Sequence, residues 1–127
     1  MEKKTIQTNK APEAIGPYSQ AVITGDLVYC SGQIGLHPDT MEMAEGLEAQ
    51  TEQVFENVKA VLGAAECTMK DVFKTTVFIK DMNDFARVNE LYAQQFEEPF
   101  PARSAVEAAR LPKDALIEVE VIARKGQ

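Results

Sequence analysis

Residues 46–66 read GLEAQTEQVFENVKAVLGAAE, and residues 73–80 read FKTTVFIK. In the first stretch apolar residues recur three and four positions apart with charged residues between them, which predicts a long amphipathic helix. The second stretch is rich in Thr, Val, Phe and Ile and alternates only loosely, which predicts a largely buried strand. A sheet with this helix packed against it is therefore expected.

The prediction extends in both directions from these two elements. Upstream, Gly25-Asp26 separates two β-prone runs and suits a two-residue hairpin turn in which glycine supplies the positive φ. Downstream, Asp81 or Asn83 can cap a second helix, and Pro99 ends it. The remaining predicted elements are that helix, with an apolar stripe from 85 to 96, and strands at 4–7, 20–24, 27–31, 102–108 and 116–124.

This order of elements also predicts which face of the sheet is covered. Two strand–helix–strand crossovers in the same direction place both helices on one face, because such crossovers are right-handed. Along the last strand the residues from Ile117 to Ala123 alternate, so that the apolar row suits the helix side while Glu118 and Glu120 point the other way. That second face is half apolar and is a candidate subunit interface, although open sheets can also face water.

Length and composition predict one domain, residues 1–127, that can bury a core without disulfides. The formal net charge is −7 and basic residues are scattered, so nucleic acid is not expected as a main partner. No apolar run has the length of a membrane span, so a soluble protein without a visible export signal is expected. Cys30 and Cys67 form no C-x-x-C pair, which favours a reducing, cytoplasmic location.

Metal and cofactor chemistry is not expected from the residues present. His37 is the only histidine, which excludes histidine-based triads and multi-histidine metal sites. Its place in a loop with turn-forming residues indicates a solvated or capping role.

Arg103 and Glu118 are the candidate functional pair. The guanidinium of an arginine is always charged and offers a rigid fork of donors that can meet both oxygens of a small carboxylate. A glutamate near such a clamp can move a proton or hold a water. The alternative stays open on local pattern alone, because many arginines are surface ion-pair partners and many strand glutamates face solvent.

Short blocks run in order over nearly the whole chain, and their joint order and spacing matter more than any one of them. They are residues 11–20 (APEAIGPYSQ), 31–33 (SGQ), 74–78 (KTTVF), 81–85 (DMNDF), 88–89 (VN), 101–104 (PARS), 109–114 (ARLPKD) and 117–120 (IEVE). Together they resemble the RidA/YjgF family of enamine and imine deaminases.

The resemblance implies a chorismate-mutase-like α+β fold, with two helices on one face of a mixed sheet, assembled as a homotrimer with clefts at the subunit interfaces. It also implies hydrolysis of reactive 2-enamino and 2-imino acids, released by pyridoxal-phosphate-dependent dehydratases, to 2-keto acids and ammonia. An imino acid is already activated, so orientation, water and a small charge stabilisation suffice without a bound cofactor.

Residue roles follow from the same resemblance. Arg103 matches the arginine that binds the substrate carboxylate, and Glu118 matches the acidic residue that positions or activates water. The positions that match residues lining or supporting the cleft are Tyr18, Ser31, Gly32 and Asn89. Position 105 departs from the common pattern, since many relatives have cysteine where this chain has Ala105.

Two other functions compete with imine hydrolysis. The same arginine clefts could bind a 2-keto acid or another small carboxylate without catalysis and report to a regulatory partner. Glu118 favours the enzyme, since a second negative charge beside a bound carboxylate hinders simple binding. A translation inhibitor or endoribonuclease is the third reading, against which the acidic charge balance counts.

Overall fold

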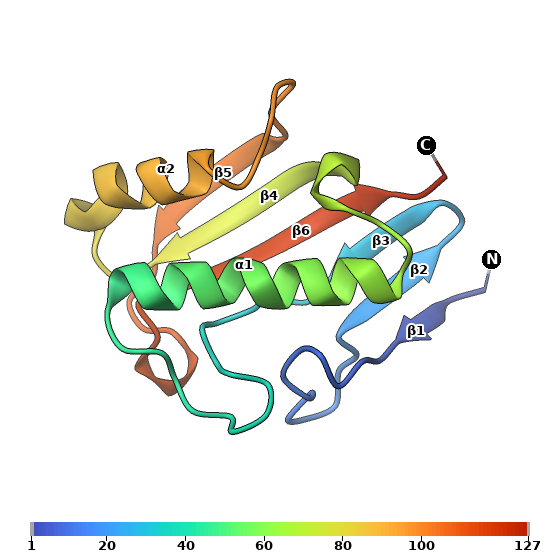
Figure 1. The fold of residues 1–127 in the computed structure, drawn as a ribbon, viewed down its shortest axis with the longest axis horizontal. Coiled ribbons are helices and arrows are strands. Elements are labelled where there is room, and N and C mark those ends of the chain that lie inside the picture. Colours follow the sequence, from blue (N-terminus) through green and yellow to red (C-terminus); the bar gives the residue numbers. More distant parts are fainter. Residues whose placement is uncertain (1, 127) are drawn as a thin grey trace.

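The computed structural model describes residues 2–126 as an α+β fold built on a six-stranded mixed sheet (Figure 1). The sheet order is β1-β2-β3-β6-β4-β5; β4 and β5 run parallel and the other neighbours are antiparallel. The strands are β1 (Lys4–Ile6), β2 (Ala21–Thr24), β3 (Leu27–Cys30), β4 (Val72–Ile79), β5 (Ala102–Glu107) and β6 (Ile117–Arg124). The helices are α1 (Leu47–Ala64) and α2 (Phe85–Ala93), with 3-10 turns η1 (Met69–Asp71), η2 (Met82–Asp84) and η3 (Pro112–Asp114).

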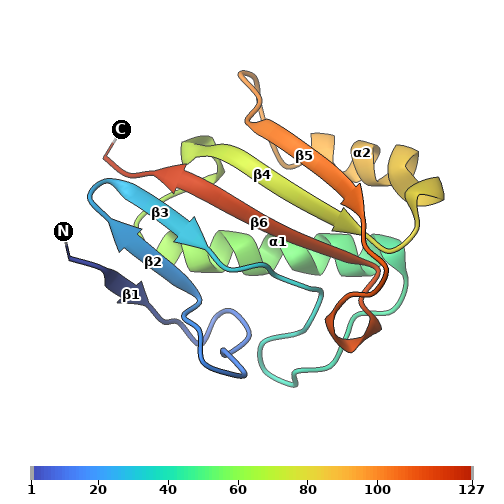
Figure 2. The same cartoon turned by 180° about the vertical axis from the view of Figure 1, so that it is seen from behind.

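Both helices lie on one face of the sheet, as the crossover argument predicts (Figure 1). The view from behind shows the opposite face with no helix over it (Figure 2). The apolar row of β6 faces α1, with Ile117, Val119, Val121 and Ala123 at most 2 % exposed. Each large apolar side chain buried in this way contributes about 1.5–3 kcal/mol of transfer free energy. The residues of α1 that pack on the sheet are Val54, Phe55, Val58, Val61 and Leu62.

The second helix is shorter than its apolar stripe predicts. Asp81, one of the two expected caps, accepts a hydrogen bond from the backbone N–H of Asn83 at 2.9 Å, but it caps the 3-10 turn η2. The α-helix proper begins at Phe85 and ends at Ala93. Phe96 is still buried, although it lies beyond the helix. Burial, not helix length, therefore explains the continuation of the stripe.

Strand β4 begins one residue earlier than the composition predicts. A register irregularity between Val72 and Lys74 in the pairing with β6 marks a bulge. Phe73, at this irregularity, is exposed. Across residues 2–126, no helix is both long enough and apolar enough to cross a bilayer.

Candidate active site

Arg103 lies on β5, at the edge of the sheet, and its side chain points toward α2. Its guanidinium carbon lies 4.8 Å from the ring centroid of Tyr92 and 5.4 Å from that of Phe85. Its Nη1 donates a hydrogen bond to Oδ1 of Asn89 at 2.8 Å. Because residues 85, 89 and 92 are spaced i, i+4 and i+7, one face of α2 supplies all three contacts. These four residues are called the Arg103 cluster below.

Arg103 differs from the other three arginines of the chain in what it contacts. Within residues 2–126, no ion pair involves Arg103, and its partners are a neutral amide and two rings. Its positive charge is therefore not neutralised, as an anion-binding arginine requires. The carboxylate partners of the other arginines are Glu48 and Glu90 for Arg87, Asp114 for Arg110 and Asp26 for Arg124.

Glu118 lies on the uncovered face of the sheet, in a pocket of about 590 Å³. Tyr18, Ser31 and Gly32, three of the positions predicted to line a cleft, line this pocket with it. Tyr18 is 53 % exposed, and its hydroxyl accepts a long hydrogen bond of 3.4 Å from the backbone N–H of Ile15. These residues form the Glu118 pocket, whose other lining residues include Gln33, Lys113 and Glu120.

Glycine at position 32 permits the approach of the Glu118 carboxyl group to the backbone. A Cβ built at this position would lie 2.1 Å from Oε2 and 2.9 Å from Cδ of Glu118. Any side chain here therefore displaces the carboxyl group, which can swing away because it ends a flexible side chain. The absence of a side chain at Gly32 thus leaves the space that the Glu118 carboxyl group occupies.

The loop that carries Ser31 and Gly32 is held by two groups of hydrogen bonds. Ser31 donates its backbone N–H to the carbonyl of Gln20 at 2.9 Å and its hydroxyl to the carbonyl of Ser19 at 2.6 Å. Farther along, Gln33 and Val119 exchange backbone hydrogen bonds at 2.9 and 3.1 Å, which ties the loop to β6 one residue from Glu118.

Two buried amide side chains complete this support. Asn57 of α1 is 1 % exposed and donates to the carbonyls of Ile34 at 3.1 Å and Leu36 at 2.9 Å. Gln20, also buried, donates to the carbonyl of Pro12 at 2.7 Å and so fixes the N-terminal wall of the pocket. Buried amides satisfied in this way make the loop geometry specific, because moving the loop would orphan them.

Electrostatics at Glu118 favour the neutral carboxyl group. Burial raises the pKa of Glu118 above its ordinary value, and the neighbouring Glu120 carboxylate raises it further. No hydrogen bond or ion pair within residues 2–126 involves the Glu118 carboxyl group. The group is therefore a proton acceptor or donor without a protein partner.

Arg103 and Glu118 of one chain do not come together. Arg103 pairs with Thr75 across the β4–β5 ladder, whereas Glu118 pairs with Phe78 across the β4–β6 ladder. Thr75 and Phe78 are three residues apart and so point to opposite faces. Strand spacing and rise place the two backbone positions about 14 Å apart. Ala105 shares the face of Arg103 and packs against the core.

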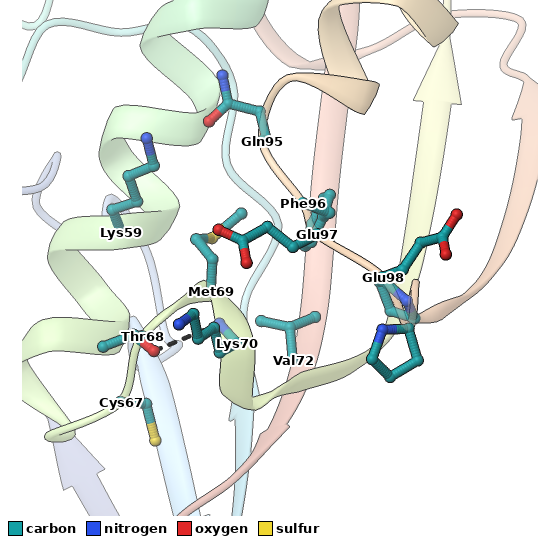
Figure 3. Close-up of a pocket in the computed structure, with 12 residues that line it drawn as sticks. Lys59, Cys67, Thr68, Met69, Lys70, Val72, Gln95, Phe96, Glu97 and Glu98 are labelled. Atoms are coloured by element: carbon teal, nitrogen blue, oxygen red, sulfur yellow. Dashed lines mark hydrogen bonds between the residues drawn. The ribbon is translucent and has the colours of Figure 1, made fainter.

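A groove of about 790 Å³ lies elsewhere, between the end of α1, η1 and the segment after α2 (Figure 3). In Figure 3 the labelled charged side chains come from separate segments: Lys59 from α1, Lys70 from η1, and Glu97 and Glu98 from the chain after α2. None of the predicted site residues lines this groove. This groove is larger than the Glu118 pocket of about 590 Å³, yet it holds none of the candidate residues.

Several supporting residues were not identified from the sequence. Phe85 and Tyr92 were assigned to the apolar stripe of a helix, and their contact with Arg103 was missed. The i, i+4, i+7 spacing with Asn89 carried a signal, since it places all three on one face. Gln20 and Asn57 gave no comparable signal, because a polar residue in a pattern does not reveal which backbone groups it will satisfy.

The environment of Cys30 disfavours its thiolate form. Cys30 adjoins Ser31, and burial raises the pKa of its thiol to about 12, with a smaller contribution from Cys67. A thiol with this pKa stays neutral and is a poor nucleophile.

The fold and these two groups of side chains define a YjgF-like α+β protein. A family model described as endoribonuclease L-PSP matches residues 8–125, and the chain belongs to this family, which includes the YjgF and RidA proteins. A 2-iminobutanoate/2-iminopropanoate deaminase of Salmonella typhimurium is 55 % identical over 123 residues, 94 % of this chain and 96 % of that protein.

Two further relatives are named by family or by a bound ligand, not by a reaction. A RutC family protein of Pyrococcus horikoshii is 54 % identical over 124 residues, 97 % of this chain and 98 % of that one. The crystal structure of Escherichia coli TdcF with bound serine has a TM-score of 0.92 and 48 % identity, and covers 97 % of this chain and 99 % of that chain.

Proposed function

We propose that this protein hydrolyses 2-imino acids, and the 2-enamino acids that tautomerise to them, to 2-keto acids and ammonia. The observation that carries the proposal is the unneutralised guanidinium of Arg103, set at a sheet edge beside neutral partners. Its free donors suit the carboxylate that every such substrate carries. The deaminase name of a relative at 55 % identity supports the same reaction.

The reaction needs few protein groups. Arg103 binds the carboxylate, and Glu118 in its ionised form takes a proton from a water as the water oxygen attacks the imine carbon. The imine nitrogen takes up the proton that Glu118 held, which gives a neutral carbinolamine. Glu118 then accepts the hydroxyl proton and passes it to the nitrogen, so that the C–N bond breaks, the keto group forms and ammonia leaves. The raised pKa of Glu118 makes its carboxylate a stronger base, which suits a group that both accepts and returns a proton.

The separation of Arg103 from Glu118 implies that one substrate contacts two subunits. We infer a homotrimer in which the Arg103 cluster of one chain meets the Glu118 pocket of the next. Exposed apolar residues on the uncovered sheet face, Tyr29 and Val106, and the unpaired edge of β5 support an interface there. Tyr18, Ser31, Gly32 and Asn89 then line or support the shared cleft.

The substrate class also suggests the setting of the reaction. Imino acids of this kind are short-lived products of dehydratases that act on serine or threonine, so a functional link to pyridoxal-phosphate-dependent dehydratases in the cytoplasm is part of the proposal. The protein itself would need no metal or cofactor for this step.

A coupled assay tests the proposal. A threonine dehydratase releases 2-iminobutanoate, and the rate of 2-oxobutanoate formation is compared with and without this protein. We expect faster formation with the protein, and light scattering that gives three times the 14.0 kDa chain mass. An unchanged rate with tight 2-oxobutanoate binding would favour the regulatory binding protein instead.

The family description names an endoribonuclease, and RNA cleavage is a separate outcome to measure. The net charge of −7 does not favour RNA binding. If the protein cleaved a labelled RNA, and Arg103→Lys and Glu118→Gln each abolished the cleavage, a ribonuclease function would be favoured over imine hydrolysis.

A further inference from the structure

Tyr92 lies beneath the guanidinium of Arg103 and is fixed by contacts on its other sides. It is 7 % exposed, and its hydroxyl lies 2.8 Å from Oγ1 of Thr75. Its ring lies 4.7 Å from that of Phe96 and meets the edge of Phe55 at 6.0 Å. The surface that Arg103 covers is therefore rigid.

The partner of the Tyr92 hydroxyl adds a second constraint. Thr75 is fully buried and is the residue directly opposite Arg103 in the β4–β5 pairing. The hydrogen bond thus links α2 to Thr75 of β4, the strand neighbour of Arg103. This hydrogen bond adds to the contacts with Phe55 and Phe96 that hold the Tyr92 ring.

The chemistry of this support matters as much as its rigidity. A ring face attracts a cation and covers one of its sides, yet it leaves the positive charge in place. A carboxylate in the same position would neutralise the guanidinium and occupy its donors. Asn89 occupies one nitrogen at 2.8 Å, so the other donor edge is left for a ligand.

We propose that Tyr92, assisted by Phe85, is a positioning residue for Arg103, which holds the guanidinium so that its free donor edge meets the carboxylate of a 2-imino or 2-keto acid. The inference rests on the proposed function, which makes Arg103 the carboxylate-binding group. Without the ring, Arg103 samples other rotamers, and ordering it again weakens binding.

Three variants separate positioning from general packing. Tyr92→Leu removes the ring, whereas Tyr92→Phe keeps the ring and removes only the hydroxyl. Phe96→Leu is the packing control, because it removes a neighbouring aromatic ring for which no contact with Arg103 is found within residues 2–126. For each folded variant we would measure kcat and KM in the coupled dehydratase assay, and the Kd of 2-oxobutanoate by calorimetry.

We expect Tyr92→Leu to raise both KM and the Kd of 2-oxobutanoate about tenfold, with kcat changed no more than about threefold. Tyr92→Phe should bind within about threefold of the wild-type protein, because the cation–ring contact remains. Phe96→Leu should lower the Tm as Tyr92→Leu does but raise the Kd less, because the ring that contacts Arg103 remains.

Different failures have different meanings. An unchanged Kd in Tyr92→Leu, or an equal rise in Phe96→Leu, would overturn the positioning role even if the wild-type protein hydrolyses imines. A wild-type protein that binds 2-oxobutanoate without turnover, with Kd raised most in Tyr92→Leu, would overturn the proposed reaction and support the positioning role.

Discussion

The Arg103 cluster and the Glu118 pocket are built in opposite ways. The Arg103 cluster sits on regular elements, a strand and one face of α2, and its contacts repeat with the period of a helix. The Glu118 pocket depends on a loop that buried amides and backbone hydrogen bonds hold in place. One group is thus set by secondary structure and the other by tertiary hydrogen bonds.

The two regions share one electrostatic property. Neither Arg103 nor Glu118 takes part in an ion pair of residues 2–126. Each of the two regions therefore has an ionisable side chain that no ion pair within its own chain neutralises. The two side chains lie on opposite faces of the sheet. Such unpaired groups favour ligand binding over stability, a trade-off that functional sites often show.

The largest expected effect comes from separating the two regions onto different chains. If the proposed homotrimer forms, Arg103→Lys and Glu118→Gln should each lose most imine hydrolysis as pure trimers, since a point charge replaces a bidentate fork or a base is lost. When the two inactive variants are co-expressed and mixed trimers are purified, about one third of the shared clefts combine a wild-type Arg103 with a wild-type Glu118, because either mixed composition leaves one such cleft in each cyclic trimer.

We therefore expect purified mixed trimers to regain roughly a third of wild-type turnover in the dehydratase assay. Two wild-type chains, co-expressed and purified in the same way, are the control for trimer assembly. Mixed trimers of confirmed composition that stay inactive would show that both residues serve one chain, against the two-subunit site.

The second effect concerns the acid group alone. Glu118→Gln keeps the shape and removes the basicity, so turnover should fall about a hundredfold or more. Glu120→Gln should act mainly on assembly. Because Glu120 raises the pKa of Glu118, Glu120→Gln should also shift the acid limb of the kcat/KM profile to lower pH. Loss of turnover in Glu120→Gln with an active Glu118→Gln trimer would reverse the two roles.

Stability provides an independent check on the same carboxyl group. A carboxyl whose pKa is raised on folding stabilises the fold below its unfolded pKa, and this contribution is lost as the pH rises through the folded value. The Tm of Glu118→Gln minus the Tm of wild type should therefore be more positive at neutral pH than in acid. A Tm difference that does not change with pH would contradict burial as the cause of the pKa shift.

The contrast between the two regions also explains what the sequence could predict. All six strands and both helices follow from periodicity and turn residues, and the alternation in β6 correctly separates Val119 from Glu118. The pairing of Arg103 with Asn89 was within reach, because both were candidates and α2 follows its own period. The loop from Ser31 to Leu36 was not, since its shape depends on Asn57, which lies more than twenty residues away.

The third prediction tests the close approach of the loop to Glu118. Gly32→Ala places a methyl group where the Glu118 carboxyl group lies, so the carboxyl group must move. Turnover should fall on the order of tenfold or more, since small misplacements of a proton-transfer group are costly. The fold should survive, because the displaced atoms end a flexible side chain.

A matched control exists in the same loop. Gly35→Ala would bring a Cβ within 2.8 Å of the backbone Cα of Gln50, which cannot swing away. This variant should lose thermal stability first, whereas Gly32→Ala should keep a Tm near wild type. A normal turnover in Gly32→Ala would mean that Glu118 acts from another position.

The smallest expected effect concerns Ala105, which shares a face with Arg103 and stands where many relatives have cysteine. If the reaction uses only the clamp and the carboxyl group, the thiol is dispensable, and Ala105→Cys should change kcat/KM for 2-iminobutanoate by less than about threefold. Ala105→Ser is the control for a polar atom of similar size. A tenfold gain in Ala105→Cys that Ala105→Ser does not reproduce, and that disappears on alkylation, would show that thiol chemistry contributes to catalysis in a way that Arg103 and Glu118 alone do not explain.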